Sequence, residues 1–152
     1  MHNELSVVAN QPMYVYGVPM FLNTVSVVIV IENGVLLIKE GDIYRFPGGI
    51  VRAHRDTVHM AAVRLVKEQT GISLLRNALL PVDFRSEPER SKEGNVVDFG
   101  LLCILEKEVK NGCIWKEADF ENKCVVDGKS MKWYMDHEKL LEHALEVASI
   151  MK

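Results

Sequence analysis

The sequence predicts one α/β domain over residues 1–152, with a mixed β-sheet between helices. Segments with strand patterns and segments with helix patterns are mixed along the chain, and no repeat or low-complexity stretch interrupts them. The length of 152 residues is enough for one hydrophobic core and too short for two ordinary domains. Apolar residues make up 48% of the chain and charged residues 26%, which is the balance of an ordered globular protein.

Three strands are expected in the first third of the chain. The stretch 24–31 is β-branched and nearly all apolar, which is typical of a central strand covered on both faces. Turn signals, the first at Glu32-Asn33-Gly34, separate it from two further strands over residues 35–39 and 43–46. Pro47-Gly48-Gly49 is expected to end the third strand and to open a flexible loop.

A helix is predicted to follow this loop. Asp56 and Thr57 can cap its start, the helix runs to about Thr70, and Gly71 is its expected C-terminal stop. Apolar residues at helical spacing mark its buried stripe, namely Val58, Ala61, Ala62, Leu65 and Val66. The rest of the chain is predicted to form strands over residues 79–85, 95–105 and 130–135 and a closing amphipathic helix over residues 137–151.

Residues 1–20 carry the least definite pattern. Val7-Val8 and residues 13–16 are apolar and could form either an extra hairpin or a subunit contact. In the second case the protein would be a homodimer.

Charge and cysteine content exclude several classes of protein. The formal net charge is −3, so no global positive field is present to hold a nucleic-acid polymer. Three cysteines without a CxxC pair argue against a disulfide framework or a zinc knuckle and fit a reducing cytosol. No apolar run reaches membrane-spanning length, and the N-terminus lacks the basic region of a signal peptide. A cytoplasmic protein without membrane contact is therefore expected.

Residues 43–72 carry the pattern that indicates chemistry. A strand ends in Gly48-Gly49, a polar loop follows, and the predicted helix places three positions on one face at spacing i, i+3 and i+4. Carboxylates at such positions can converge on magnesium, which prefers a few carboxylates together with waters and substrate oxygens. In this chain the three residues are Leu65, Glu68 and Gln69, so a single carboxylate is present.

This segment resembles the Nudix box, Gly-x5-Glu-x7-Arg-Glu-U-x-Glu-Glu-x-Gly-U, in which U is aliphatic. The residues that match are Arg64, Val66, Glu68, Gly71 and Ile72. Outside the box, the loop and strand over residues 89–97 and the stretch 132–134 before the last helix look like those of the ADP-ribose pyrophosphatase-like branch. The resemblance covers roughly residues 22–151 and implies the α/β/α sandwich of the MutT-like Nudix hydrolases.

The box is degenerate in this chain. Leu65 and Gln69 stand where the family has glutamates, and Asp56 replaces the upstream glutamate. Six residues separate Gly49 from Asp56 where the family has five, and the usual acidic stretch reads Arg52-Ala53-His54-Arg55. Leucine cannot bind a metal, and an amide oxygen is a weaker ligand for a dication than a carboxylate.

The resemblance implies Mg²⁺-dependent hydrolysis, with Mn²⁺ as a substitute, of a nucleoside diphosphate linked to another moiety, such as ADP-ribose. In that interpretation Glu68 and Arg64 are catalytic, with Arg64 orienting Glu68. The metal ligands would be Glu68, Gln69, Asp56 and the carbonyl of Gly49. The substrate contacts would be Arg45, Phe46, Arg52, Arg55 and Arg90. Candidates for a general base outside the box are Glu87, Glu89, Glu93, Glu117 and Glu121.

Several alternatives stay open on the sequence alone, and one of them is a purely structural scaffold whose pocket is closed by side chains. The chain could be a nucleotide-binding Nudix domain that has lost hydrolysis and acts as a sensor or interaction module, which Leu65 and Gln69 favour. The basic residues Arg52 and Arg55 could either hold a phosphate directly, where metal ions would otherwise lie, or belong to a solvated loop.

Overall fold

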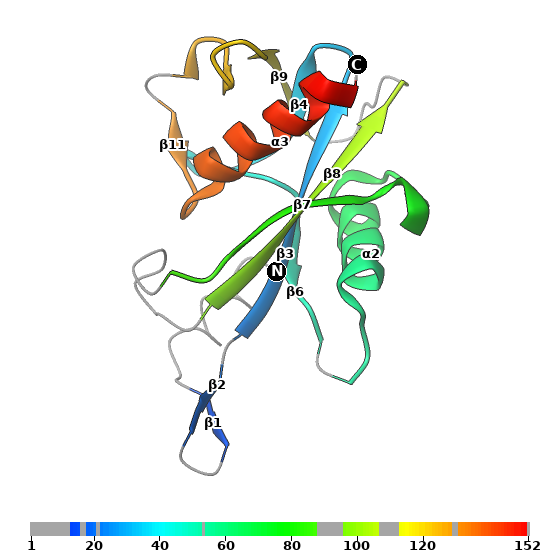
Figure 1. Ribbon diagram of the computed structural model, residues 1–152, viewed down its shortest axis with the longest axis vertical. Helices are drawn as coiled ribbons and strands as arrows, with labels where there is room; N and C mark the ends of the chain where they lie inside the picture. Colours follow the sequence, from blue (N-terminus) through cyan, green and yellow to red (C-terminus); the bar gives the residue numbers. More distant parts are fainter. Residues whose placement is uncertain are drawn as a thin grey trace.

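The computed structural model describes residues 13–15, 18–20, 22–52, 54–87, 96–106, 113–128 and 131–151 (Figure 1). A curled mixed β-sheet has helix α2 (Val58–Thr70) on one face and helix α3 (His137–Met151) on the other. The predicted fold, a mixed sheet between helices, is confirmed.

The sheet is built around strand β3. The strand order is β10 (Cys124–Val125), β9 (Ile114–Asp119), β4 (Gly34–Glu40), β3 (Leu22–Ile31), β8 (Val96–Leu105) and β7 (Leu80–Arg85). Strand β3 runs parallel to β8 over its whole length and antiparallel to β4. The short strand β5 (Ile43–Arg45) pairs with β4 and, in parallel, with β11 (Lys132–Trp133).

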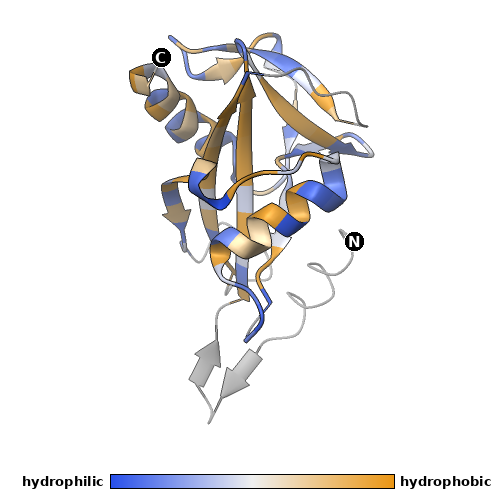
Figure 2. Cartoon of the chain, turned by 90° about the vertical axis from the view of Figure 1, so that its right-hand side faces the viewer, coloured by the Kyte–Doolittle hydropathy of each residue, from blue (hydrophilic) through white to orange (hydrophobic). Residues whose placement is uncertain are grey.

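Strand β3 divides the core into two clusters. Val25, Val27 and Ile29 pack with α2, whereas Val28 and Val30 pack with α3. Side chains of a strand alternate between its faces, so a strand that is buried on both faces needs the continuous apolar run that this sequence has. Figure 2 shows the strands of the sheet as the most hydrophobic part of the chain.

Both ends of helix α2 agree with the predicted caps. The side chain of Thr57 accepts a hydrogen bond from the Met60 amide at 3.1 Å, and Gly71 has a left-handed conformation with φ of 79°. Neither α2 nor α3, the two α-helices of the described ranges, is long and apolar enough to cross a bilayer.

Two segments differ from the sequence prediction in extent. The last predicted strand, over residues 130–135, is reduced to β11. In the N-terminal segment, β1 (Met13–Val15) and β2 (Val18–Met20) pair as an antiparallel hairpin. A hairpin was one of the two predicted alternatives, but the partner of residues 13–15 is β2, and Val7-Val8 lies outside the described residues.

The expectation of a flexible loop after Phe46 was wrong. Strand β6 (Gly48–Ile50) pairs antiparallel with β3, and Gly49 lies opposite Val25. A Cβ atom on Gly48 would lie 1.9 Å from the carbonyl oxygen of Val25. The glycine is therefore required by the close approach of two backbones, which a sequence pattern does not distinguish from a loop signal.

We expect Gly48→Ala to destabilise the protein by about 3 kcal/mol or more, because backbone atoms cannot move aside as a flexible side chain would. Gly49→Ala is a matched control. Both glycines have φ of 157°, but a Cβ atom on Gly49 would meet only the Leu65 methyl groups, at an ordinary 3.5 Å. Urea unfolding measures the free energy of unfolding of both variants. Equal losses of stability would show that the close approach to Val25 does not cause the destabilisation.

Candidate functional site

Helix α2 is tied to the preceding loop by Arg64. Its guanidinium lies 2.9 Å from a carboxylate oxygen of Asp56 and donates to the Ile50 carbonyl at 3.3 Å. Burial alone would raise the pKa of Asp56, but hydrogen bonds from the Arg64 side chain and the Arg52 amide hold this pKa below its usual range. Asp56 is thus an ionised partner of Arg64.

Glu68 is the only carboxylate among the three positions on the helix face. Its side chain is 46% exposed, and one of its oxygens lies 3.8 Å from the Arg64 guanidinium. Leu65, one turn earlier, is 3% exposed and packs in the core between α2 and the sheet. The position that holds a glutamate in the Nudix box is therefore used here for hydrophobic packing against the strand that carries Gly49.

Gln69 makes contacts to the backbone of strand β6. Its amide oxygen accepts from the Gly48 amide at 3.0 Å and from the Arg45 guanidinium at 3.1 Å, and its amide nitrogen donates to the Gly48 carbonyl at 2.8 Å. Arg45 also forms an ion pair with Glu40, with 2.7 Å between nitrogen and oxygen. The structure thus brings together Arg45, Gly48 and Gln69.

These donors do not fit a Nudix-type Mg²⁺ or Mn²⁺ site. One exposed carboxylate, one amide that already bonds to the backbone and one aspartate paired with arginine are few ligands for a hard dication. Within the described ranges, no group of three or more His, Cys, Asp or Glu side chains could hold a metal ion.

The proposed substrate contacts fall into different environments. Arg52 and Arg55 are exposed on the loop before α2, and no ion-pair partner of either side chain lies among the described residues. Phe46 is 1% exposed and belongs to the core beneath α3. Arg90 lies outside the described residues. Of the candidate general bases, Glu87, Glu117 and Glu121 are exposed, and Glu89 and Glu93 lie outside the described residues.

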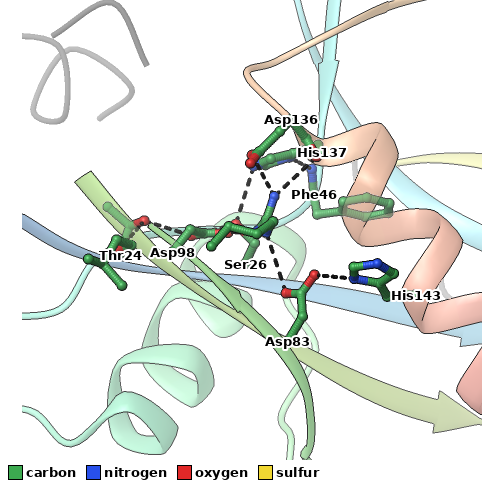
Figure 3. Close-up of polar contacts among 10 residues, drawn as sticks. Thr24, Ser26, Phe46, Asp83, Asp98, Asp136, His137 and His143 are labelled. Atoms are coloured by element: carbon green, nitrogen blue, oxygen red, sulfur yellow. Dashed lines mark hydrogen bonds and ion pairs between the residues drawn. The ribbon is translucent and has the colours of Figure 1, made fainter. Parts of the chain in front are cut away.

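A buried polar network on the α3 side was missed by the sequence analysis (Figure 3). Asp98 on β8 accepts hydrogen bonds from Thr24 at 2.6 Å and from Ser26 at 3.0 Å, and it forms an ion pair with Arg85 on β7. Arg85 also lies 2.6 Å from a carboxylate oxygen of Asp136, just before α3. Thr24 and Ser26, two polar residues spaced i, i+2 at buried positions of β3, were the available signal.

His137, the first residue of α3, completes this network. Its Nδ1 accepts from the Phe46 amide at 3.0 Å, so in the neutral ring Nε2 carries the proton and donates to the Ser26 hydroxyl at 3.3 Å. Ser26 in turn donates to Asp98. His137 therefore cannot accept the Ser26 proton, and the Ser–His–Asp contacts are structural and do not form a nucleophile. Burial lowers the pKa of His137 to about 4.

The chain belongs to the NUDIX domain family, because the family model of the NUDIX domain matches residues 20–146. A search of curated protein sequences finds no match.

Solved structures agree on the fold at low sequence identity. A MutT/nudix family protein from Enterococcus faecalis is 18% identical, with a TM-score of 0.75, and the match covers 99% of this chain and 70% of that one. The NUDIX domain of Shewanella oneidensis NrtR, complexed with ADP ribose, is also 18% identical, with a TM-score of 0.68 and coverage of 84% and 88%.

A third structure is a bifunctional NMN adenylyltransferase/ADP ribose pyrophosphatase from Francisella tularensis, complexed with AMP and a Mn ion. It is 17% identical, with a TM-score of 0.59, and the match covers 99% of this chain and 44% of that one. The present chain thus spans less than half of that bifunctional protein.

The burial of neutral His137 predicts a loss of stability in acid. Its folded pKa of about 4 lies below the ordinary 6.5, so its contribution is complete above pH 6.5 and is lost as the pH falls towards 4. The loss amounts to about 3 kcal/mol. The neighbouring charges partly cancel: those of Asp98 and Asp136 raise the pKa of His137, and those of Arg85 and Arg45 lower it. In His137→Gln, which can donate and accept but does not titrate, urea unfolding from pH 7 to 4 should show a shallower decline; parallel curves would contradict this assignment.

Proposed function

We propose that this chain binds a nucleoside diphosphate linked to another moiety, of the ADP-ribose type, and does not hydrolyse it. The observation that carries the proposal is the replacement of two helix-face carboxylates by the core residue Leu65 and the backbone-bonded Gln69. The protein has too few ligands for a dication, so positive side chains must neutralise the phosphates of such a ligand.

The ligand class is supported by two of the similar structures. The NrtR NUDIX domain is complexed with ADP ribose, and the Francisella protein is complexed with AMP. In this chain Arg52 and Arg55 are exposed on the loop before α2, and guanidinium groups bind phosphate oxygens as forked donors. Arg45 and Arg90 are the further candidate phosphate contacts, whereas Phe46, at 1% exposure, is no longer proposed to touch the ligand.

A nucleic-acid polymer is not proposed as a partner. NrtR has also been crystallised with a 27mer DNA, and the match covers 62% of that longer chain. The net charge of −3 gives no overall attraction to a nucleic-acid backbone. A homodimer and a cytoplasmic location stay predictions.

Hydrolysis of the diphosphate bond is the second candidate function. The retained pair of Glu68 and Arg64 favours it, because these residues keep their places in the box and lie within 3.8 Å of each other. Metal-dependent turnover would require Glu68 to act with ligands that come from the nucleotide, from water or from the loops.

Binding without metal is the first expected result. Isothermal titration of ADP-ribose should give the same Kd, within about twofold, in EDTA and in millimolar Mg²⁺, because phosphate charge is met by arginines. In Arg52→Ala/Arg55→Ala the Kd should rise by about tenfold or more, and the salt dependence should become weaker. Arg76→Ala is the control, because Arg76 is an exposed arginine in the short 3-10 helix over residues 76–78, which follows the C-terminal end of α2. Binding that needs Mg²⁺, or a double variant that binds normally, would argue against this proposal.

Turnover distinguishes the two candidate functions. With ADP-ribose and Mg²⁺, we expect no release of AMP above the uncatalysed rate for the wild type, measured by chromatography. If turnover is present, Glu68→Gln should lower kcat by about 100-fold, since the single helix-face carboxylate is lost. Turnover that is abolished by this substitution would establish the hydrolase and overturn the binding-only proposal.

A further inference from the structure

We propose that Gln69 is a positioning residue whose amide takes the place of a cation, so that the Gly48–Gly49 strand is fixed against α2 without metal. In the Nudix box this position holds a glutamate. The proposal rests on the proposed function only where ligand affinity is concerned, and the fixing of the strand can be tested without any ligand.

The contacts of the Gln69 amide define its orientation. The Gly48 amide and the Arg45 guanidinium are donors and face the oxygen, and the Gly48 carbonyl is an acceptor and faces the nitrogen. All three contacts therefore agree on which atom is oxygen. One neutral side chain accepts from and donates to the backbone of the same residue, which a carboxylate cannot do because it only accepts.

Phe46 and Pro47, which precede Gly48, are held by α3 and by strand β3. The Phe46 amide donates to His137 of α3, and the Pro47 carbonyl accepts from the Val27 amide of β3 at 2.8 Å. Residues 46–48 are thus bonded on one side to Gln69 of α2 and on the other to His137 of α3, and both of these side chains are neutral. The Arg45 guanidinium also donates to the Phe46 carbonyl at 3.1 Å. Arg45 is balanced by Glu40, so no charge in these contacts needs a cation.

Glutamate at position 69 would reverse one of these contacts. One carboxylate oxygen could still accept from the Gly48 amide and from Arg45. The other would face the Gly48 carbonyl oxygen, which lies 2.8 Å from the present amide nitrogen. Two acceptors repel unless a proton or a cation lies between them. Gln69→Glu should therefore make the segment sensitive to pH and to divalent cations, and the wild type should lack this sensitivity.

The experiment compares wild type, Gln69→Glu, Gln69→Ala and Met60→Glu. Met60→Glu adds the same charge at an exposed position of α2 and is the control. At pH 7 in EDTA, Gln69→Glu should have a Tm several degrees below wild type. The gap should narrow at pH 5, where a protonated carboxyl can donate, or in millimolar Mg²⁺. The Tm of Met60→Glu should not respond in this way. Because variants are compared at the same pH, the titration of His137 affects all of them equally.

Gln69→Ala tests the amide bond directly. Hydrogen exchange followed by NMR should show the Gly48 amide exchanging at least tenfold faster than in wild type, while the Gly71 amide, bonded to Lys67, serves as the internal reference. The Kd for ADP-ribose should rise about tenfold. The proposal would be overturned by an unchanged exchange rate of the Gly48 amide. It would also be overturned if the Tm difference between wild type and Gln69→Glu changed with neither pH nor Mg²⁺. Faster exchange at Gly48 with no ADP-ribose binding by wild type would instead uphold the positioning role and reject the proposed function.

Discussion

The close approach of the β6 backbone to β3 at Gly48 is the constraint on which the site depends. It leaves no room for a Cβ atom and makes residues 48–50 a strand of the sheet. Once this strand is in place, α2 can lay Leu65 on Gly49, and α3 can meet Phe46 through His137. Both helices are therefore positioned by one short segment, and a change there affects both faces of the sheet.

Charge is distributed differently from what the Nudix box would suggest. The face of α2 keeps one exposed carboxylate, Glu68, whereas the space beneath α3 holds Asp98 and Arg85 almost fully buried. Burying an ion pair costs desolvation energy, which is offset here because Thr24 and Ser26 also donate to Asp98. The buried charged groups of this fold thus hold α3 against the sheet, whereas α2 presents a single carboxylate that could bind a metal ion.

Local patterns were enough to predict most of the fold, but much less of the site. The apolar run of β3, the caps of α2 and the stripe of α3 depend on neighbouring residues, so periodicity identified them. Strand β6 was mistaken for a loop because glycine serves both purposes. The partners of Gln69 and Asp98 come from distant segments, with Ser26 and Asp98 separated by 72 positions, and no local spacing indicates such pairs.

The parallel pairing of β3 with β8 has a consequence for how the chain folds during synthesis. Leu22 pairs with Val96 and Ile31 with Leu105, so the central strand meets this neighbour only after more than seventy further residues have been made. Contacts between such distant residues form slowly, because a long loop must close first. From Val27 to Ile31, strand β3 is apolar on both faces, so a ribosome-bound chain would expose this part until β8 emerges. The hairpin with β4 and the early pairing with β6 would cover the opposite edge of β3 in the meantime, so the edge that β8 later occupies is the one open to aggregation while the chain is made.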